Sequence, residues 1–287
     1  MTTRAFVLAA GLGTRLGALT KQLPKPLVPV GDRPAIAHVV DAIRAGGIGD
    51  ITANVFHGRD ALVAWLGAAG VRASVEDELL GTAGGLLQAT HGREAGAVLV
   101  YNADVFAPSL DVGALLREHG RGGHDATLVV RRASPGTVGN VGIGREGRVV
   151  RLRTTRVSED PEIVAGEFLG VHVLEPAFTL PRRGCVVGDV YLASPGRALH
   201  AFLHDEPTWD VGTPASYLDA NLGWLARTAS RVFLGAGASV VGAADLVVAG
   251  AGARARGRLE RVVLWPGASF DGDLRDAIVT PSGVVAA

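Results

Sequence analysis

The sequence predicts an α/β fold, in which a Rossmann-like, mixed and mainly parallel sheet flanked by helices is followed by a short left-handed β-helix. Three observations support this prediction. Short apolar runs alternate with amphipathic segments through the first half of the chain, a glycine-rich turn directly follows the first apolar run, and the C-terminal part consists largely of small residues and valines. Such alternation is typical of a parallel sheet with helices on both faces.

The elements of the first half follow from the apolar pattern. We expect strands in RAFVLAA, ITANVF, VRASVE and AVLVYNAD, and helices in AIAHVVDAIRAGG, DALVAWLGAAG, TAGGLLQATHG and VGALLREHG. Glycine closes several of these helices, as it often does. Ligands of such sheets bind at the carboxyl ends of the strands, so the loop after Ala9, the acidic stretch after Val75 and the NAD sequence after Tyr101 are expected to carry the site.

The middle of the chain, from about Ala126 to Leu174, contains short β-type runs, namely ATLVVRR, GNVGIG, GRVVRLRTT and GEFLGVHVL. We expect an antiparallel insertion or lid beside the main sheet. The stretch TWDVGTPASYLDANLGWLAR then predicts a helix, because Pro214 suits a first helical turn and apolar residues recur after it at helical spacing.

The C-terminal β-helix is predicted from a repeat. LGAGAS at Leu234 and LWPGAS at Leu264 begin a multiple of six residues apart, and an aliphatic residue at every sixth position is typical of hexapeptide coils. A disordered tail is disfavoured because valine, leucine and tryptophan are too frequent there. We therefore expect one domain over residues 1–228 and a short, hexapeptide-like coil over residues 229–287.

Composition excludes several classes of protein. The 28 basic and 28 acidic residues cancel, so no global charge attracts nucleic acid or an anionic membrane. No apolar run is long enough to span a bilayer. The single cysteine, Cys185, excludes an internal disulfide framework, and the eight histidines form no zinc motif. We expect a soluble, cytoplasmic protein in which His172 is structural.

Residues 11–30, GLGTRLGALTKQLPKPLVPV, match neither familiar nucleotide loop. Gly11, Gly13 and Gly17 give G-x-G-x-x-x-G, with Leu16 where a dinucleotide fingerprint needs its third glycine. No Gly-Lys pair follows, as a P-loop requires. The stretch instead offers a tight glycine turn whose N–H groups can approach a phosphate, followed by Thr14 and by an arginine.

Two cations in this stretch suit a polyphosphate. The Arg15 guanidinium can grip phosphate oxygens with two parallel hydrogen bonds. Lys25 stands between Pro24 and Pro26, which are expected to hold its backbone extended and stiff. A solvated loop lysine is the alternative.

With these motifs in view, the chain resembles the sugar-1-phosphate nucleotidylyltransferases, closest in look to mannose-1-phosphate guanylyltransferase-like members with a C-terminal hexapeptide β-helix. The family signature is similar to GLGTRLGALT followed by PKPLVPV, and LLGTAGGL, NADVF, EFLGVHVL and WDVGTPASYLDAN follow in the family's order. One departure is Ala18, where the family usually has proline.

The resemblance implies that a sugar-1-phosphate oxygen attacks the α-phosphorus of a nucleoside triphosphate, giving a nucleotide-sugar and pyrophosphate. Both substrates are anions, so the reaction needs cations more than a nucleophilic side chain. The implied catalytic residues are Arg15, Lys25, Asp104 and Asp210, of which the two aspartates would bind Mg²⁺. Taken alone, each aspartate could equally be a turn or helix-cap residue.

The nucleotide-binding residues implied by the resemblance lie in two stretches. Gly81, Thr82 and Ala83 would read the base at a helix start, and Glu76 could accept from guanine N1–H and N2–H₂, which leans weakly toward GTP. A capped helix without a ligand and a solvated acidic edge are the alternatives. The nucleotide-binding set is Ala10, Gly11, Gly13, Thr14, Arg15, Glu76, Gly81, Thr82 and Ala83.

The resemblance also implies a sugar-phosphate site made of Asn140, Gly142, Glu167, Gly170 and Asp189. Many members carry Glu-Lys-Pro after the strand that here reads GRVVRLRTTR, and the lysine grips the sugar phosphate. This chain has Thr154 and Thr155 there, with Arg153 and Arg156 alongside, and the sequence does not decide which arginine substitutes.

Three other functions remain open at this point. The protein could be a uridylyltransferase for N-acetylmuramate or another amino-sugar 1-phosphate, because LLGTAGGL does not fix the base. It could be a catalytically silent scaffold that binds a nucleotide-sugar and assembles through the β-helix, although the intact cations and aspartates argue against this. An acyltransferase is disfavoured because the coil is short and lacks a histidine base. A homo-oligomer through the coil is plausible.

Overall fold

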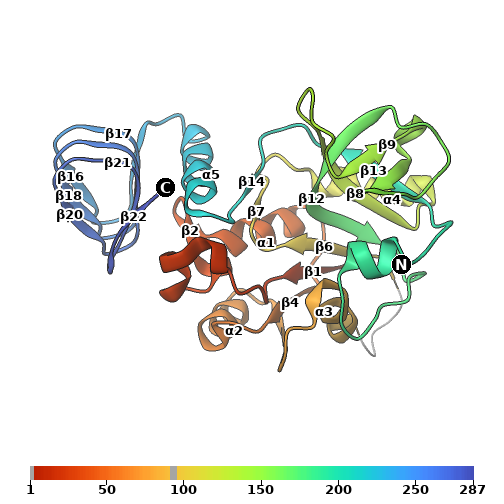
Figure 1. Ribbon diagram of the computed structural model, residues 1–287. Helices are drawn as coiled ribbons and strands as arrows, with labels where there is room; N and C mark the ends of the chain where they lie inside the picture. Colours follow the sequence, from red (N-terminus) through yellow and green to blue (C-terminus); the bar gives the residue numbers. More distant parts are fainter. Residues whose placement is uncertain (1–2, 91–95) are drawn as a thin grey trace. The chain divides into compact units, whose positions relative to one another are not determined.

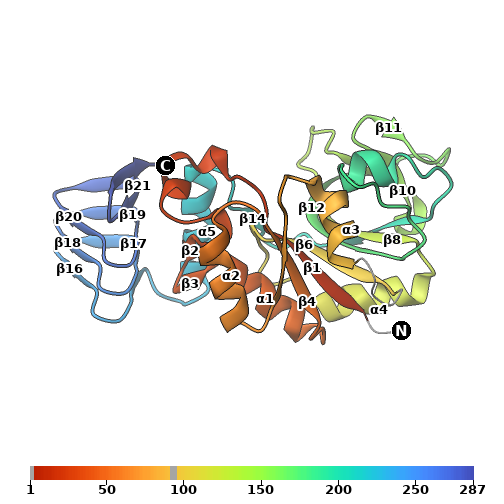
Figure 2. The same cartoon turned by 90° about the horizontal axis from the view of Figure 1, so that it is seen from below.

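The computed structural model describes residues 3–90 and 96–287 and divides into two compact units. The first unit comprises Met1–Gly11, Val39–Ala103 and Ala107–Glu206, and the second comprises Leu12–His38, Asp104–Phe106 and Pro207–Ala287. Figures 1 and 2 show their secondary structure from two directions. No helix in the described part of the chain is both long and apolar enough to cross a membrane.

A ten-stranded mixed sheet forms the first unit, which confirms the predicted fold class (Figures 1 and 2). Its parallel part is β1 (Arg4–Leu8) between β4 (Ile51–Val55) and β6 (Val98–Asn102), with β5 (Arg72–Val75) beyond β4. The strands β1 and β4 are almost wholly buried, as expected of parallel strands covered on both faces.

Helices connect these strands at the predicted positions. They are α1 (Ala35–Ala45), α2 (Arg59–Ala68), α3 (Gly81–Thr90) and α4 (Val112–Gly122). The residues that begin α1 belong to the second unit and the remainder to the first. The last two residues of the predicted segment TAGGLLQATHG lie outside the described residues.

The middle of the chain belongs to the main sheet and forms no separate lid, so that alternative is wrong. The strand β12 (Val164–Leu174) pairs antiparallel with β6, β8 and β9. The strands around it are β8 (Ala126–Arg132), β9 (Val141–Ile143), β10 (Val149–Leu152) and β11 (Thr155–Arg156). The strand β13 (Leu199–Leu203), which the sequence pattern did not reveal, pairs parallel with β8. Two short helical turns, η3 (Arg145–Gly147) and η4 (Val186–Tyr191), complete the unit.

The second unit contains short elements around one long helix. They are η1 (Thr14–Lys21), η2 (Lys25–Leu27), the hairpin β2 (Pro29–Val30) with β3 (Arg33–Pro34), and the pair β7 (Val105–Phe106) with β14 (Trp209–Asp210). The predicted helix is α5 (Pro214–Ala226), and Thr213 caps it by accepting from Ser216 N at 3.2 Å. Proline in the first turn needs no N–H partner there, which fits this start.

The C-terminal strands stack in parallel as the coil of a β-helix (Figure 1). One sheet contains β15 (Val232–Leu234), β17 (Ala244–Ala249), β19 (Leu259–Leu264) and β21 (Leu274–Thr280), and the other contains β16 (Ser239–Val241), β18 (Arg254–Arg256) and β20 (Ser269–Asp271). The final strand, β22 (Gly283–Ala286), pairs antiparallel with β21 and closes the stack.

The repeat of this coil is not the predicted hexapeptide. Val232 pairs with Val247, which in turn pairs with Val262, so one coil takes fifteen residues. The two sequences LGAGAS and LWPGAS are therefore two coils apart, and their spacing was divisible by six only by coincidence. Leu246, Arg261 and Asp276 share one position in successive coils and all have positive φ, which bends each long strand there.

A single hydrophobic core joins the coil to the N-terminal segment of the second unit. Leu16, Leu19, Val28 and Val30 belong to the same buried cluster as the valines and leucines of β17, β19 and β21. The compact units do not coincide with the predicted domains, because the second unit combines the coil with Leu12–His38. The division into domains of residues 1–228 and 229–287 stays a prediction.

His172 on β12 is buried in the first unit and is expected to make stability depend on pH. Its Nδ1 hydrogen-bonds the buried Tyr191 hydroxyl, and burial lowers the pKa of His172 from 6.5 to about 3. Between pH 6.5 and pH 3, His172 is therefore protonated in the unfolded chain but neutral in the folded chain. This contribution to stability is complete above pH 6.5 and falls as the pH decreases toward 3.

We expect His172→Gln, which keeps a hydrogen-bonding group but does not titrate, to flatten this dependence. Between pH 7 and pH 5 the wild type should lose about 2 kcal/mol of unfolding free energy more than the variant. Urea unfolding at the two pH values measures the difference. Equal losses in the two proteins would contradict the assignment.

Candidate active site

The glycine loop begins where a buried asparagine holds the end of β1. Asn54 Oδ1 accepts from Ala9 N at 2.7 Å and from Ala10 N at 3.3 Å. The Ala10 N–H is therefore engaged, and only N–H groups further along the loop remain for a phosphate. The sequence reasoning missed Asn54, although a polar residue inside an apolar strand run is a usable signal because it requires partners when buried.

Beyond this point, residues of the second unit offer free backbone donors. Gly13 has φ 64°, and a Cβ there would lie 2.8 Å from Thr20 Cγ2 and 3.0 Å from Lys25 Cβ, so glycine is needed for conformation and for space. The N–H groups of Gly13, Thr14 and Arg15 have no acceptor in the part of the chain that the structure describes. Such adjacent free donors form a concavity suited to an anion.

Lys25 lies on a short helical turn, so the extended backbone expected from its flanking prolines is wrong. Leu27 N donates to Pro24 O at 2.8 Å, and the backbone is extended only at the residues that flank the turn, Pro24 and Val28. The Lys25 side chain is only 12% exposed, and its Nζ contacts Asp104 Oδ2 and lies 3.8 Å from Asp210 Oδ1. The lysine is thus held firmly by burial and by two carboxylates.

The β7–β14 ladder brings the two aspartates together. Asp210 pairs with Val105, and Val211 N donates to Asp104 O at 2.8 Å. The rings of Phe106 and Trp209 stack beside this pairing with centroids 5.6 Å apart. The two carboxylates, remote in sequence, therefore occupy neighbouring positions.

Arg15 completes the cluster, with its Nη2 3.9 Å from Asp210 Oδ2. The four residues implied as catalytic, namely Arg15, Lys25, Asp104 and Asp210, all meet within the second unit. Gly212 lies against them, since a Cβ there would be 3.0 Å from Asp210 Oδ1 and 3.2 Å from Arg15 Nη2.

The pKa of Asp210 is raised above its ordinary value. Partial withdrawal from solvent is the largest cause and the neighbouring Asp104 carboxylate adds to it, while Lys25 and Arg15 oppose the shift. Two adjacent carboxylates repel one another unless a cation lies between them. The arrangement therefore favours binding of positive charge.

These carboxylates fit a magnesium ion. Mg²⁺ prefers oxygen ligands, keeps several waters and needs only one or two protein carboxylates when substrate phosphates supply the rest. Asp104 and Asp210 form such a pair, and among residues 3–90 and 96–287 no group of three or more His, Cys, Asp or Glu side chains could hold a metal ion without other ligands.

The residues implied for the base lie in the first unit, and one of them is unsuited. Glu76 is only 1% exposed, its Oε1 accepts from Asn54 Nδ2 at 2.7 Å and its Oε2 accepts from Leu80 N at 3.1 Å. A base contact by Glu76 is therefore contradicted, because the carboxylate is buried and both oxygens are used inside the protein.

The start of α3 packs against the segment before η4. Ala83 N donates to Gly184 O at 2.9 Å, and Thr82 Oγ1 accepts from Val186 N at 2.8 Å. Gly81 has φ 72°, and a Cβ there would lie 2.4 Å from Gly184 O. The three residues thus have structural partners here, and their contact with a base stays a prediction.

The sugar candidates also lie in the first unit, on β9, β12 and η4 and, for Asn140, directly before β9. Glu167 pairs with Arg131 at 2.8 Å, and Asn140 Oδ1 accepts from Phe168 N at 2.8 Å. Asp189 Oδ2 accepts from Cys185 N at 2.6 Å. Gly170 has φ 75° and approaches Asn102 closely.

Gly142 is not placed to contact a sugar, contrary to the expectation from the sequence. It is buried, and a Cβ there would lie 2.3 Å from Glu162 Oε2, because the ion pair between Glu162 and Arg151 crosses over it. This packing explains why position 142 is glycine.

The structure distinguishes the arginines near β10. Arg151 is engaged by Glu162, and Arg156 donates to Asp160 O and Ser158 O. Arg153 has positive φ, its N donates to Asn140 O at 2.7 Å, and its Nη2 lies 3.4 Å from Cys185 Sγ. Arg153 therefore joins the stretch containing Asn140 to the one containing Asp189, with its guanidinium exposed.

The positive charge of Arg153 contributes to a lowered pKa of Cys185. Burial by itself raises the pKa of the thiol, but hydrogen bonds from the backbone of Gly188 and Val187 and the nearby Arg153 outweigh it, so the pKa is lowered.

Comparison with known proteins agrees with this geometry. The family model described as a MobA-like NTP transferase domain matches residues 5–210, and the chain therefore belongs to this family of nucleotidyltransferases. Mannose-1-phosphate guanyltransferase of Aspergillus fumigatus is 30% identical over 243 residues, which are 79% of this chain and 66% of that protein. The protein of the same name from Schizosaccharomyces pombe is 30% identical over 260 residues, 83% of this chain and 70% of that protein.

The chain thus spans about two thirds of the length of these relatives. Among solved structures, HddC from Yersinia pseudotuberculosis complexed with GMP-PN has the same fold, with a TM-score of 0.62 and 21% identity over 78% of this chain and all of that one. The matches place the chain with the sugar-1-phosphate nucleotidyltransferases.

Proposed function

We propose that the protein transfers a nucleoside monophosphate from a nucleoside triphosphate to a sugar 1-phosphate, with GTP and mannose 1-phosphate as the favoured pair. The observation that carries this proposal is the cluster of Lys25, Asp104 and Asp210 beside free N–H groups of the glycine loop. The names of the fungal relatives and the nucleotide bound to the Yersinia protein support guanine and mannose.

In the proposed reaction, an oxygen of the sugar phosphate attacks the α-phosphorus in line with the bond to the β-phosphate. The new P–O bond forms as that bond breaks, and pyrophosphate leaves with its electron pair. The protein contributes positioning and positive charge, because the attacking and leaving groups are both anions.

Lys25 would serve the α-phosphate and Arg15 the remaining phosphates, together with the N–H groups of Gly13 and Thr14. On substrate binding, Lys25 would exchange its carboxylate partners for phosphate oxygens, and Asp104 and Asp210 would hold Mg²⁺. The ion, when bound, would neutralise phosphate charge and stabilise the leaving pyrophosphate.

On the sugar side, Glu167, Asn140 and Asp189 would contact hydroxyl groups, and Arg153 would take the role that a lysine has in many relatives. Arg153 is favoured over Arg151 and Arg156 because both of these already neutralise or cap groups of the protein. A cytoplasmic location and assembly through the coil are further parts of this proposal, supported by the single cysteine and by the stacked coil.

A pyrophosphate-release assay tests the function. Wild-type protein with Mg²⁺ should release pyrophosphate fastest with GTP and mannose 1-phosphate in a panel that pairs GTP, UTP, dTTP, CTP and ATP with several sugar 1-phosphates. Preference for UTP with an amino-sugar phosphate would replace the favoured pair. Absence of turnover with every pair, while a nucleotide-sugar still binds, would instead support a silent scaffold.

Arg15, Lys25, Asp104 and Asp210 together form what we call the phosphate cluster, and two substitutions test it. We expect Lys25→Ala and Asp210→Asn each to lower kcat by several orders of magnitude while near-UV circular dichroism stays unchanged, because the first removes the cation that would face the α-phosphate and the second removes a carboxylate that would hold Mg²⁺. The raised pKa of Asp210 should place the acidic decline of wild-type activity at a higher pH than an ordinary aspartate would. Lys21→Ala, on the exposed end of η1, is the matched control. A near-native rate in either test variant removes that residue from the mechanism.

Arg153 is tested by a matched pair of arginine substitutions. Arg153→Ala should raise KM for the sugar phosphate at least tenfold and leave KM for the nucleotide within about twofold, because one charge-assisted contact is lost. Arg156→Ala, a nearby arginine with backbone partners only, should change both values little. An unchanged KM for the sugar phosphate in Arg153→Ala, or an increase no larger than that in Arg156→Ala, would contradict this role for Arg153.

A further inference from the structure

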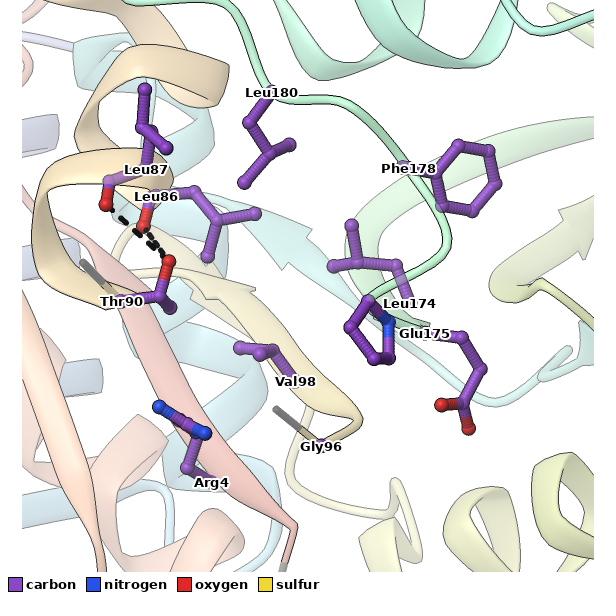
Figure 3. Close-up of a pocket in the computed structure, with 11 residues that line it drawn as sticks. Arg4, Leu86, Leu87, Thr90, Gly96, Val98, Leu174, Glu175, Phe178 and Leu180 are labelled. Atoms are coloured by element: carbon purple, nitrogen blue, oxygen red, sulfur yellow. Dashed lines mark hydrogen bonds between the residues drawn. The ribbon is translucent and has the colours of Figure 1, made fainter. Parts of the chain in front are cut away.

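A small pocket opens in the first unit at the end of the sheet where β1 and β6 begin (Figure 3). Arg4 and Val98 are the first residues of these parallel strands, whereas the glycine loop follows Leu8 at the end of β1 and the NAD sequence begins at Asn102, the last residue of β6. Each strand advances about 3.3 Å per residue, so the pocket and the strands' carboxyl ends are about 13 Å apart. The pocket therefore does not belong to the substrate edge of the sheet.

The walls of the pocket are apolar. Its volume is about 240 Å³. The side chains that give it this character come from α3, β6, the end of β12 and the segment that follows β12, and are Leu86, Leu87, Val98, Leu174, Phe178 and Leu180.

One cation faces this apolar space. Arg4 is only 8% exposed, and Figure 3 shows its guanidinium turned toward the space between Thr90 and Val98. Within residues 3–90 and 96–287, no hydrogen bond or ion pair of the guanidinium is found. The Thr90 hydroxyl donates to Leu86 O at 2.7 Å.

Glu175 also lines the pocket, but its carboxylate serves another residue. Its Oε1 lies 3.1 Å from His119 Nε2. Arg4 is therefore a nearly buried charge in an apolar setting for which residues 3–90 and 96–287 supply no counter-ion, and such a charge is unfavourable unless an anion joins it.

We propose that this pocket binds a small organic anion, a carboxylate or a phosphate monoester with an apolar body, whose charged group pairs with Arg4. An apolar cavity of about 150 Å³ holds a benzene molecule, so the present volume admits a ring or a branched chain with one charged substituent. The guanidinium supplies two parallel donors for such a group, and the leucines enclose the body. The site is independent of the proposed transfer reaction.

Isothermal titration of the full chain with benzoate, phenyl phosphate and benzyl alcohol tests this site. At least one of the two anions should bind wild-type protein with one-to-one stoichiometry, and which one binds identifies the anionic group. Arg4→Met should weaken that binding at least tenfold but leave the weaker binding of benzyl alcohol unchanged. Arg121→Met, at an exposed position at the end of α4, is the matched control and should bind like wild type.

Two further variants keep the result decisive. Leu180→Trp fills the pocket from a partly exposed position without touching the charge, and it should also weaken anion binding at least tenfold even if Arg4→Met folds poorly. Lys25→Ala should retain the binding, which separates this pocket from the phosphate cluster. The proposal is overturned if neither anion binds saturably, if Arg4→Met and Leu180→Trp both bind as Arg121→Met does, or if only Lys25→Ala abolishes binding.

Discussion

The pairing of two short strands is the constraint on which the phosphate cluster depends. The ladder between β7 and β14 sets Asp104 beside Asp210, and the two carboxylates then need a cation between them. Lys25 supplies it in the structure described here, and its side chain is held by burial as well as by charge. With substrates bound, phosphate oxygens would replace the carboxylates as partners of Lys25, and a metal ion would replace Lys25 as the cation between Asp104 and Asp210.

The coil at the C-terminus stabilises the segment that carries this lysine. Tyr217 on α5 donates to Pro29 O at 2.6 Å and accepts from Trp265 Nε1 at 2.9 Å. Asn221 Oδ1 accepts from Gly31 N at 2.8 Å. These buried bonds connect the coil, the helix and the hairpin that follows Lys25, so the coil acts as part of the support for the cluster and not as an appended module.

Several residues that look functional in the sequence are explained by packing. Glu76 accepts a hydrogen bond from Asn54, which holds the end of β1, so the buried carboxylate of Glu76 is not available to a base. Gly142 is small because an ion pair crosses it. A motif read from sequence does not distinguish these roles, since a glycine needed for close approach to a ligand and one needed for close approach to a neighbouring side chain look alike.

The sequence by itself determined the α/β class, the positions of the parallel strands and their helices, and the start of α5, because local periodicity records them. An ordered set of motifs also predicted Arg15, Lys25, Asp104 and Asp210 as catalytic; the structure brings these four side chains together, and their roles stay a prediction. Only the tertiary structure decided the fifteen-residue coil, the placement of the middle strands in the main sheet and the burial of Glu76. It also decided that Arg153 has different partners from Arg151 and Arg156. Strand pairing and burial depend on residues distant in the chain, and no local pattern records which side chains they bring together.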